Sequence, residues 1–259
     1  MAIFGKGGSD FLSKMKDAAN SAAEKAKDAV DSAKNAYEAK KAEEEAKRQQ
    51  CLEAAGVRAA EIKSAVEDGF NGNVFFEGIE KNELLKFSKE FYDKIVLPAS
   101  SVSNSGILMY PNLDQDKKFN KFISDNSFFD KNETAIIYFR NDSKHEYVFT
   151  EKALYFSVPL ADAKGYFSKE RISLDIISDI HFEISEAAIK LMCNGYEISS
   201  VSYCKSANED AISMNRYFQA VSTKDFIITD EEVDALIKEK IGAKCWRKYR
   251  NISFMTMNC

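Results

Sequence analysis

Apolar residues near the start of the chain recur every three or four positions, which is the spacing of one face of an α-helix. The series consists of Phe11, Met15, Ala18, Ala22, Ala26, Ala29, Ala33 and Tyr37. Several members also recur at an interval of about eleven residues, which is typical of a helix without left-handed supercoil. Because Ser9 or Asp10 is placed to cap the first turn, the pattern predicts a long amphipathic helix that starts there.

Charged residues surround this apolar face in an ordered way. Lys14 and Lys25 flank it on one side, while Lys16, Lys27 and Lys34 flank it on the other. Asp17, Glu24, Asp28, Asp31 and Glu38 lie opposite. The arrangement suits a helix on a membrane surface and resembles the eleven-residue repeats of lipid-surface and desiccation-type stress proteins. The predicted membrane-contact residues are Phe11, Met15, Lys14, Lys16, Lys25, Lys27, Lys34 and Tyr37.

Two other interpretations of this helix remain open. Its face is mostly alanine, which buries little apolar area on a membrane. Alanine is also a strong helix former in any setting. The helix therefore either contacts a lipid surface, packs on another helix or on the rest of the chain, or forms a solvated stalk.

Beyond Tyr37 the pattern changes twice. Residues 38–50 are polar all round and suit a helical spacer. An apolar face then restarts with Leu52, Ala55, Ala59, Ile62 and Val66. Gly69, Asn71, Gly72 and Asn73 end the helix. We therefore expect an extended helical region over residues 1–70 and a domain boundary after it.

Residues 71–130 are expected to be helical and irregular and to pack on the body of the protein. Leu84, Phe87, Phe91 and Ile95 share one face of a helix that should stop at Pro98. Residues 98–111 suit a loop. A short helix over 116–123 would bury Phe119, Phe122 and Ile123.

From Glu133 onward, short apolar runs and alternation with period two predict strands. The expected strands cover residues 135–139, 147–150, 154–158, 181–184, 188–192 and 196–199. Asn194-Gly195 favours a tight hairpin turn. Ser206 and Glu209 have capping-box spacing before a helix whose apolar face comprises Ala211, Met214, Phe218 and Val221. The order predicts an α+β protein in which an antiparallel half-barrel is capped by a C-terminal helix.

Two runs carry a family resemblance: residues 133–138 (ETAIIY) and 147–155 (YVFTEKALY). The second is similar to a hairpin of the bacterial pleckstrin-homology-like (PH-like, GRAM-like) family, and residues 169–180 resemble the segment before that family's next strand. The resemblance covers residues 133–222 and implies a PH-like β domain over 131–224. It also implies binding of a protein or a lipid surface rather than catalysis.

Residues 225–259 contain a second predicted helix and a basic tail. Thr229 and Glu232 form another capping box, and Val233, Leu236, Ile237 and Ile241 share a face before Gly242. The basic patch that follows comprises Lys244, Trp246, Arg247, Lys248, Tyr249 and Arg250. We expect it to meet a membrane interface or an acidic partner, or to fold back on the acidic body.

Charge and composition narrow the class of protein. The formal net charge is −5, yet residues 238–250 hold six basic side chains and one acidic one, so the central part is strongly acidic. An acidic body disfavours nucleic acid as a partner. No signal peptide or membrane-spanning segment is predicted. Because the five cysteines lack CxxC spacing, we expect reduced thiols and a cytoplasmic protein, or one peripheral on the inner face of the membrane.

The sequence offers little material for catalysis. The two histidines, His145 and His181, cannot build a multi-histidine metal site, and the glycines of residues 5–9 (GKGGS) do not have P-loop order. We therefore predict no catalytic residues, metal or cofactor, and a non-enzymatic binding or adaptor protein with a protein partner or membrane surface. The alternatives are a homo-oligomer assembled through the first helix and an enzyme of unrecognised type.

Overall fold

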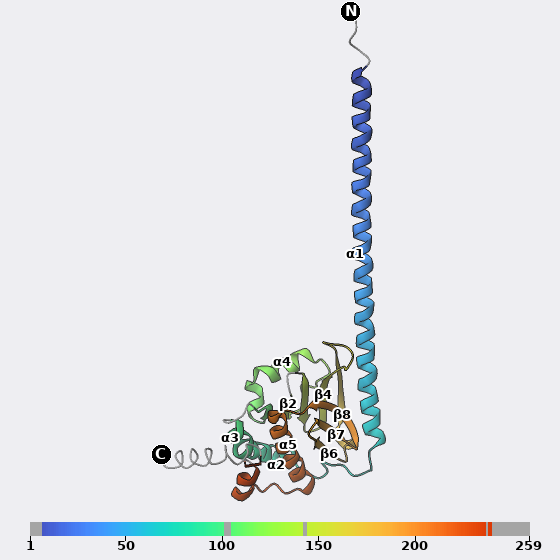
Figure 1. Ribbon diagram of the computed structural model, residues 1–259. Coiled ribbons are helices and arrows are strands. Elements are labelled where there is room, and N and C mark those ends of the chain that lie inside the picture. The colour runs from blue at the N-terminus through green and yellow to red at the C-terminus, as the bar shows by residue number, and fades with distance from the viewer. Residues whose placement is uncertain (1–6, 101–104, 142–143, 237, 240–259) are drawn as a thin grey trace, which may run out of the picture. The chain divides into compact units, whose positions relative to one another are not determined.

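The computed structural model describes residues 7–100, 105–141, 144–236 and 238–239. The chain divides into two compact units between Glu53 and Ala54. Figure 1 labels the helices and strands of both units. The first unit consists of the N-terminal part of one helix, and the second contains both β-sheets with the helices that pack on them.

Helix α1 (Gly7–Asp68) is the long helix that the apolar pattern predicts. It begins at Gly7, so the predicted start at Ser9 or Asp10 is wrong: both residues lie inside the first turns. A capping side chain favours a helix start without fixing its position. Every described side chain from residue 13 to residue 50 is exposed. Along the polar spacer, Glu43 and Lys47 form an i,i+4 ion pair of 2.7 Å, which supports an isolated helix.

The last turns of α1 belong to the second unit. Ala55, Ala59, Ile62 and Val66 are all buried, whereas Leu52 is 49% exposed. The helix ends at Asp68, immediately before Gly69, as the sequence predicts. The division between the compact units therefore precedes the glycine- and asparagine-rich segment, because the restarted apolar face packs into the core of the body.

A second helical region follows in three parts: α2 (Lys81–Phe91), the π-helix η1 (Tyr92–Val96) and α3 (Leu97–Ser100). The predicted apolar face is confirmed, since Leu84, Phe87, Phe91 and Ile95 are all buried. The predicted stop at Pro98 is wrong. Pro98 lies in α3, which continues directly from η1, and such a change to π-helical bonding beside a proline is one way a helix accommodates it.

The first sheet has five antiparallel strands in the order β1-β2-β3-β4-β5. They are β1 (Ile107–Met109), β2 (Ala135–Asn141), β3 (His145–Thr150), β4 (Ala153–Pro159) and β5 (Phe167–Ser173). The three predicted strands of this region correspond to β2, β3 and β4. The sequence predicted a loop at β1 and no strand at β5. These are the edge strands, and β1 is very short while β5 is rich in charged residues.

The second sheet has three antiparallel strands, β6 (Ile180–Ile184), β7 (Ala188–Cys193) and β8 (Tyr196–Ser202), all at predicted positions. A short 3-10 helix, η3 (Leu174–Ile176), precedes β6. The Asn194-Gly195 hairpin is confirmed: both residues have positive φ, 50° and 78°, as a type I′ turn requires. The Oγ of Ser199 and the hydroxyl of Tyr147 are hydrogen-bonded, which joins the two sheets.

Helix α5 (Lys205–Thr223) packs on the second sheet and beside α2 (Figure 1). The Asn215 amide accepts from the Phe182 N–H at 2.6 Å and donates to the Phe182 carbonyl at 2.8 Å, so it satisfies the exposed edge of β6. The predicted apolar face of α5 is buried. The capping box of Ser206 and Glu209 is wrong, because Cys204 is the N-cap residue and Ser206 already lies inside the helix.

The first sheet is buried on both faces. Its inner face, with Phe139, Tyr147 and Phe156, joins the main core between the sheets, α2 and α5. Its outer face is covered by a smaller core that includes Phe119 and Phe122. These two residues belong to α4 (Lys117–Asp125), which follows the 3-10 helix η2 (Asn112–Gln115). The short predicted helix is therefore confirmed, with Asp116 as its N-cap.

Residues 230–236 are helical, and the second capping box is confirmed. The Thr229 Oγ1 accepts from the Glu232 N–H at 3.2 Å, and a Glu232 carboxylate oxygen accepts from the Thr229 N–H at 3.1 Å. Leu236 is buried and Val233 is partly buried. The predicted positions of Ile237, Ile241 and Gly242 lie outside the described residues.

The structure is thus a mixed α+β protein with a long N-terminal helix and two antiparallel sheets that do not close into one barrel. Within the described ranges, no helix combines the length and apolarity needed to cross a lipid bilayer.

Candidate functional site

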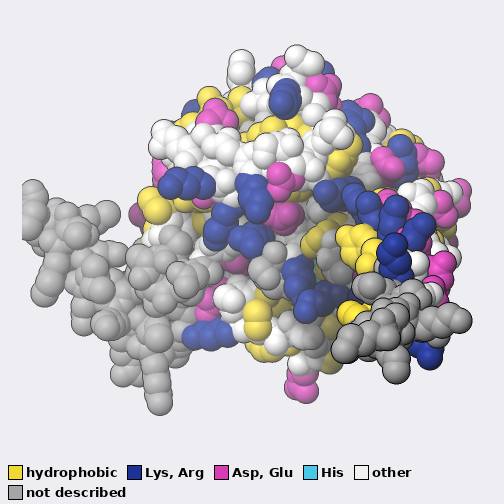
Figure 2. Space-filling model, turned by 90° about the horizontal axis from the view of Figure 1, so that it is seen from above, with side chains coloured by type: hydrophobic (Ala, Val, Ile, Leu, Met, Phe, Trp, Pro, Cys, Tyr) yellow, Lys and Arg dark blue, Asp and Glu magenta, His cyan; other side chains and the backbone are white. Residues whose placement is uncertain are grey.

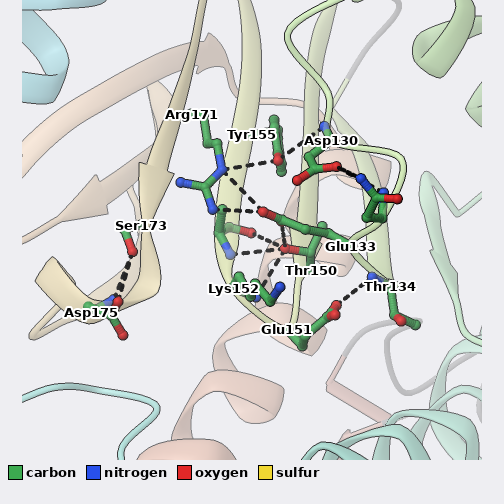
Figure 3. A network of polar contacts seen from close by, with 12 residues as sticks. Asp130, Glu133, Thr134, Thr150, Glu151, Lys152, Tyr155, Arg171, Ser173 and Asp175 are labelled. Carbon is green, nitrogen blue, oxygen red and sulfur yellow. Dashed lines mark hydrogen bonds and ion pairs between the residues drawn. The ribbon is translucent and has the colours of Figure 1, made fainter.

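The sequence motif of residues 147–155 forms the centre of a polar network (Figure 3). Thr150 ends β3, and its Oγ1 accepts hydrogen bonds from the backbone N–H groups of Lys152 (3.1 Å) and Ala153 (2.9 Å). These bonds close the β3–β4 turn in the way typical of threonine turns. The same hydroxyl donates to the Glu133 carboxylate.

Glu133 is the buried acid of this network. Its side chain is 2% exposed, and its Oε1 lies 2.7 Å from the Arg171 Nη2 on β5. The Arg171 Nε also donates to the Tyr155 hydroxyl at 3.1 Å. Burial alone would lower the pKa of Arg171, but the hydrogen bonds to Glu133 and Tyr155 outweigh it and raise the pKa above the usual value. The guanidinium therefore stays positively charged and balances the negative charge of the buried carboxylate.

Glu151, in the same turn, binds the segment that precedes β2. Its carboxylate accepts from the Thr134 N–H and from the Lys81 Nζ, the latter at 3.3 Å. The network thus connects α2, the start of β2, the β3–β4 turn and β5. Its acids and bases are paired with one another, so we assign it a structural role: it fixes the hairpin that carries the family resemblance.

A second polar feature lies at the other end of the outer sheet face. Arg140, Glu146, Ser157 and Lys169 are register partners on four neighbouring strands, β2 to β5. Residues in register point to one side of a sheet, and here that side is the outer one, next to Tyr138 and Tyr155 of the outer core. We call these four residues the polar row. It marks where the aromatic cover of the outer face ends.

Helix α4 and the polar row border a groove of about 280 Å³. We call it the α4 groove. Its lining includes Lys118, Lys121, Phe122, Asp125 and Asn126 from the α4 segment, the polar row, and Phe167. Four of these side chains are basic and two are acidic, an excess of positive charge on a strongly acidic body. Figure 2 shows Lys and Arg side chains gathered in groups, with acidic ones between them.

Contacts at the groove floor fix some of these charges. The Tyr138 hydroxyl donates to the Glu146 Oε1 at 2.6 Å, and the Arg140 Nε lies 4.0 Å from the same oxygen. Burial, together with the bond to Glu146, raises the pKa of Tyr138 far above its usual value, so the phenol stays a proton donor. Glu146 is thereby held on the floor rather than free to reach the lysines.

The predicted membrane-contact residues all belong to α1 in the first unit. Met15 is 56% exposed and Tyr37 is 69% exposed, and Lys14, Lys16, Lys25, Lys27 and Lys34 are exposed as well. The Phe11 side chain lies outside the described part. So does the whole predicted basic patch: Lys244, Trp246, Arg247, Lys248, Tyr249 and Arg250.

Other reactive groups have ordinary surroundings. The His181 Nδ1 lies 2.8 Å from the Asp179 Oδ2, at an exposed position. Cys51, Cys193 and Cys204 are free thiols, and burial raises the pKa of Cys193 to about 12. Among the described residues no group of three or more His, Cys, Asp or Glu side chains is placed to hold a metal ion.

The sequence interpretation missed the α4 groove. Its residues come from four strands and a helix. The strand residues become neighbours only when the strands pair in their register. The turn at residues 151–152 does predict the pairing of β3 with β4, and hence that Glu146 and Ser157 are neighbours. The unpredicted strand β5 hid Lys169.

Comparisons of the chain with protein-family models, with curated proteins and with solved structures find no match.

Proposed function

We propose that the protein is a non-enzymatic binding protein, with a PH-like body that binds a protein partner and an N-terminal helix that attaches it to an anionic membrane surface. One observation carries the attachment. Three large apolar side chains of the first unit are exposed: Met15 by 56%, Val30 by 66% and Tyr37 by 69%. At about 100° per residue these three fall within about 60° of one another on the helix.

The charges around this face favour a lipid surface. Lysine side chains flank it on both sides, and acids lie on the opposite side. Lysine stems extend along an apolar surface while their ammonium groups reach phosphates at the level of the headgroups. The acidic face would remain in water. A helix on an anionic membrane gains about 1 kcal/mol for each such lysine.

The order of elements in the body supports the PH-like part of the proposal. Four consecutive antiparallel strands, β2 to β5, are followed by three, β6 to β8, and then by the single helix α5. This is the order that the family resemblance implies. Strand β1 and helix α4 are additions to it. Because PH-like domains act as binding scaffolds, the resemblance favours binding over catalysis.

Three tyrosines of the body have surroundings typical of structural groups. The tyrosines whose pKa burial raises include Tyr138, Tyr155 and Tyr217, and each hydroxyl is hydrogen-bonded to a protein group. Burial and these hydrogen bonds keep the three phenols in their protonated form.

Vesicle flotation tests the attachment. The full-length chain should float with vesicles of phosphatidylcholine and phosphatidylglycerol. The variant Val30→Glu/Tyr37→Glu should stay at the bottom of the gradient, because two carboxylates then lie in the apolar face. A matched control, Ser21→Glu/Asn35→Glu, adds the same charge on the opposite face at exposed positions and should float. Equal flotation of both variants, or none by the wild type, would refute the proposal.

The same exposed face supports a second candidate, self-association of the helix. Light scattering without lipid separates the two. A homo-oligomer that Val30→Glu/Tyr37→Glu converts to a monomer, while Ser21→Glu/Asn35→Glu leaves it intact, would assign the face to contact between copies of the chain.

A further inference from the structure

The α4 groove contains three lysines without counter-ions. Lys118, Lys121 and Lys169 line it, and none of their ammonium groups forms an ion pair or hydrogen bond with a described residue. All three are exposed. Several other lysines of the body do form ion pairs, for example Lys190 with Glu197 at 2.9 Å, so what distinguishes these three is that they surround one groove. In an acidic protein, unpaired lysines around one groove make a local site for an anion.

Asn126 adds a second feature to the groove, a buried hydrogen-bond acceptor without a partner in the described part of the chain. It is 4% exposed, and its Nδ2 donates to the Phe122 carbonyl at 2.7 Å, which settles the orientation of the amide. Its Oδ1 has no hydrogen-bond partner among the described residues. A buried acceptor without a partner costs about 1–3 kcal/mol. The oxygen is itself buried, so a ligand recovers that energy by displacing a neighbouring groove side chain and donating an N–H or O–H group to it.

The acids of the groove limit the charge of the ligand. Asp125 and Glu146 are part of the lining. A phosphate carries close to two negative charges at neutral pH and is repelled by nearby carboxylates. A single carboxylate is repelled less, and it pairs with the lysines equally well. The volume of about 280 Å³ is at the lower end for small-molecule sites and suits one or two side chains.

We propose that the α4 groove binds an acidic peptide segment of a partner protein, with one Asp or Glu carboxylate among Lys118, Lys121 and Lys169 and a peptide N–H donating to the Asn126 Oδ1. A peptide provides both groups that the groove lacks: a carboxylate of single charge and N–H donors spaced along a backbone. Phe122 and Phe167 supply apolar walls for the peptide chain. This proposal specifies the kind of partner that the body binds, and it therefore rests on the proposed binding function. It does not depend on membrane attachment by α1.

A selection from a random heptapeptide library on the full-length protein provides the test. We expect enrichment of peptides with Asp or Glu. The variant Lys118→Gln/Lys121→Gln should bind the selected peptide about five- to twentyfold more weakly by fluorescence polarisation. Lys117→Gln is the matched control. It removes one positive charge, where the double variant removes two, from an exposed site on the same helix outside the groove, and it should change the affinity by less than about twofold.

Three results would overturn the proposal: no enriched peptide, enrichment without acidic residues, or equal weakening by Lys117→Gln. A chemical-shift titration of the Asn126 side-chain amide separates the sources of the anion. The selected peptide should shift it, and the glutamine version of that peptide should not. If inorganic phosphate shifts the amide signal more than the peptide does, the ligand of the groove is a phosphorylated molecule instead of an acidic peptide. The two experiments are independent. If the groove does not bind acidic peptides, the full-length chain should still float with vesicles, and if the chain does not float, the peptide titrations should still give the expected result.

Discussion

The side-chain amide of Asn194 donates a hydrogen bond of 2.8 Å to the backbone carbonyl of Val66. The same Nδ2 donates to the Ile176 carbonyl at 2.7 Å, and the Oδ1 accepts from the N–H groups of Ser178 (2.7 Å) and Asp179 (3.1 Å). One turn residue therefore joins the end of α1 to the segment before β6. The chain beside it is closely packed: a Cβ at Gly69 would come within 2.4 Å of the Asn194 carbonyl oxygen.

Replacing Asn194 by glycine should lower the free energy of unfolding by about 2–4 kcal/mol, because several backbone groups lose their partner. Glycine accepts the positive φ of 50°, so backbone strain does not contribute. Urea denaturation measures the effect. Asn73→Gly makes the same chemical change in an exposed loop and should cost less than about 0.5 kcal/mol. Similar losses in the two variants would contradict the role of the amide.

The last turns of α1 should behave as part of the body. Ile62 is completely buried, so Ile62→Ala should destabilise the body by about 2–5 kcal/mol. Val57 lies on the same helix and is 59% exposed, and Val57→Ala should change stability by less than about 0.5 kcal/mol. Thermal unfolding followed by circular dichroism compares the two. If both variants unfold like the wild type, these turns do not belong to the core.

The sequence predicted the elements whose apolar pattern is strong. Strands β3 and β4 contain the uninterrupted apolar runs 147–149 and 153–156, because both faces of the first sheet are buried. Strand β5 was missed because its alternation is interrupted by Lys169, Glu170 and Arg171, and an edge strand tolerates charge where a central strand does not. A strand of three residues such as β1 carries no period at all.

The capping signals show a similar contrast. Thr229 and Glu232 form the predicted reciprocal bonds, whereas Glu209 is buried and lies 3.7 Å from the Lys205 Nζ. Burial of the second capping residue was invisible in the sequence, because it depends on how α5 packs. The α4 groove was unpredictable for a related reason: its lysines meet Asn126 and the polar row only through tertiary packing.

The network around Glu133 should be sensitive to its cation. Arg171→Met would leave a carboxylate of 2% exposure with Thr150 as its remaining partner. We expect a loss of about 2–4 kcal/mol, since an uncompensated buried charge is costly. The double variant Glu133→Leu/Arg171→Met removes both charges and should recover much of this loss. Equal stability of the single variant and the wild type in urea would show that the ion pair contributes nothing.

The capping box of Thr229 and Glu232 should make the helicity of residues 230–236 depend on pH. The backbone N–H of Thr229 lowers the pKa of Glu232, and the nearby Arg216 contributes with its charge. A carboxyl whose folded pKa is lowered stabilises the fold above the ordinary glutamate pKa of 4.5 and loses that contribution as the pH falls through the folded value. The Cα chemical shifts of residues 230–236 should therefore lose helical character in acid.

Glu232→Gln should remove this pH dependence, whereas Glu231→Gln, at an exposed neighbour, should retain it. The same acid transition in Glu232→Gln would mean that another group controls the helix.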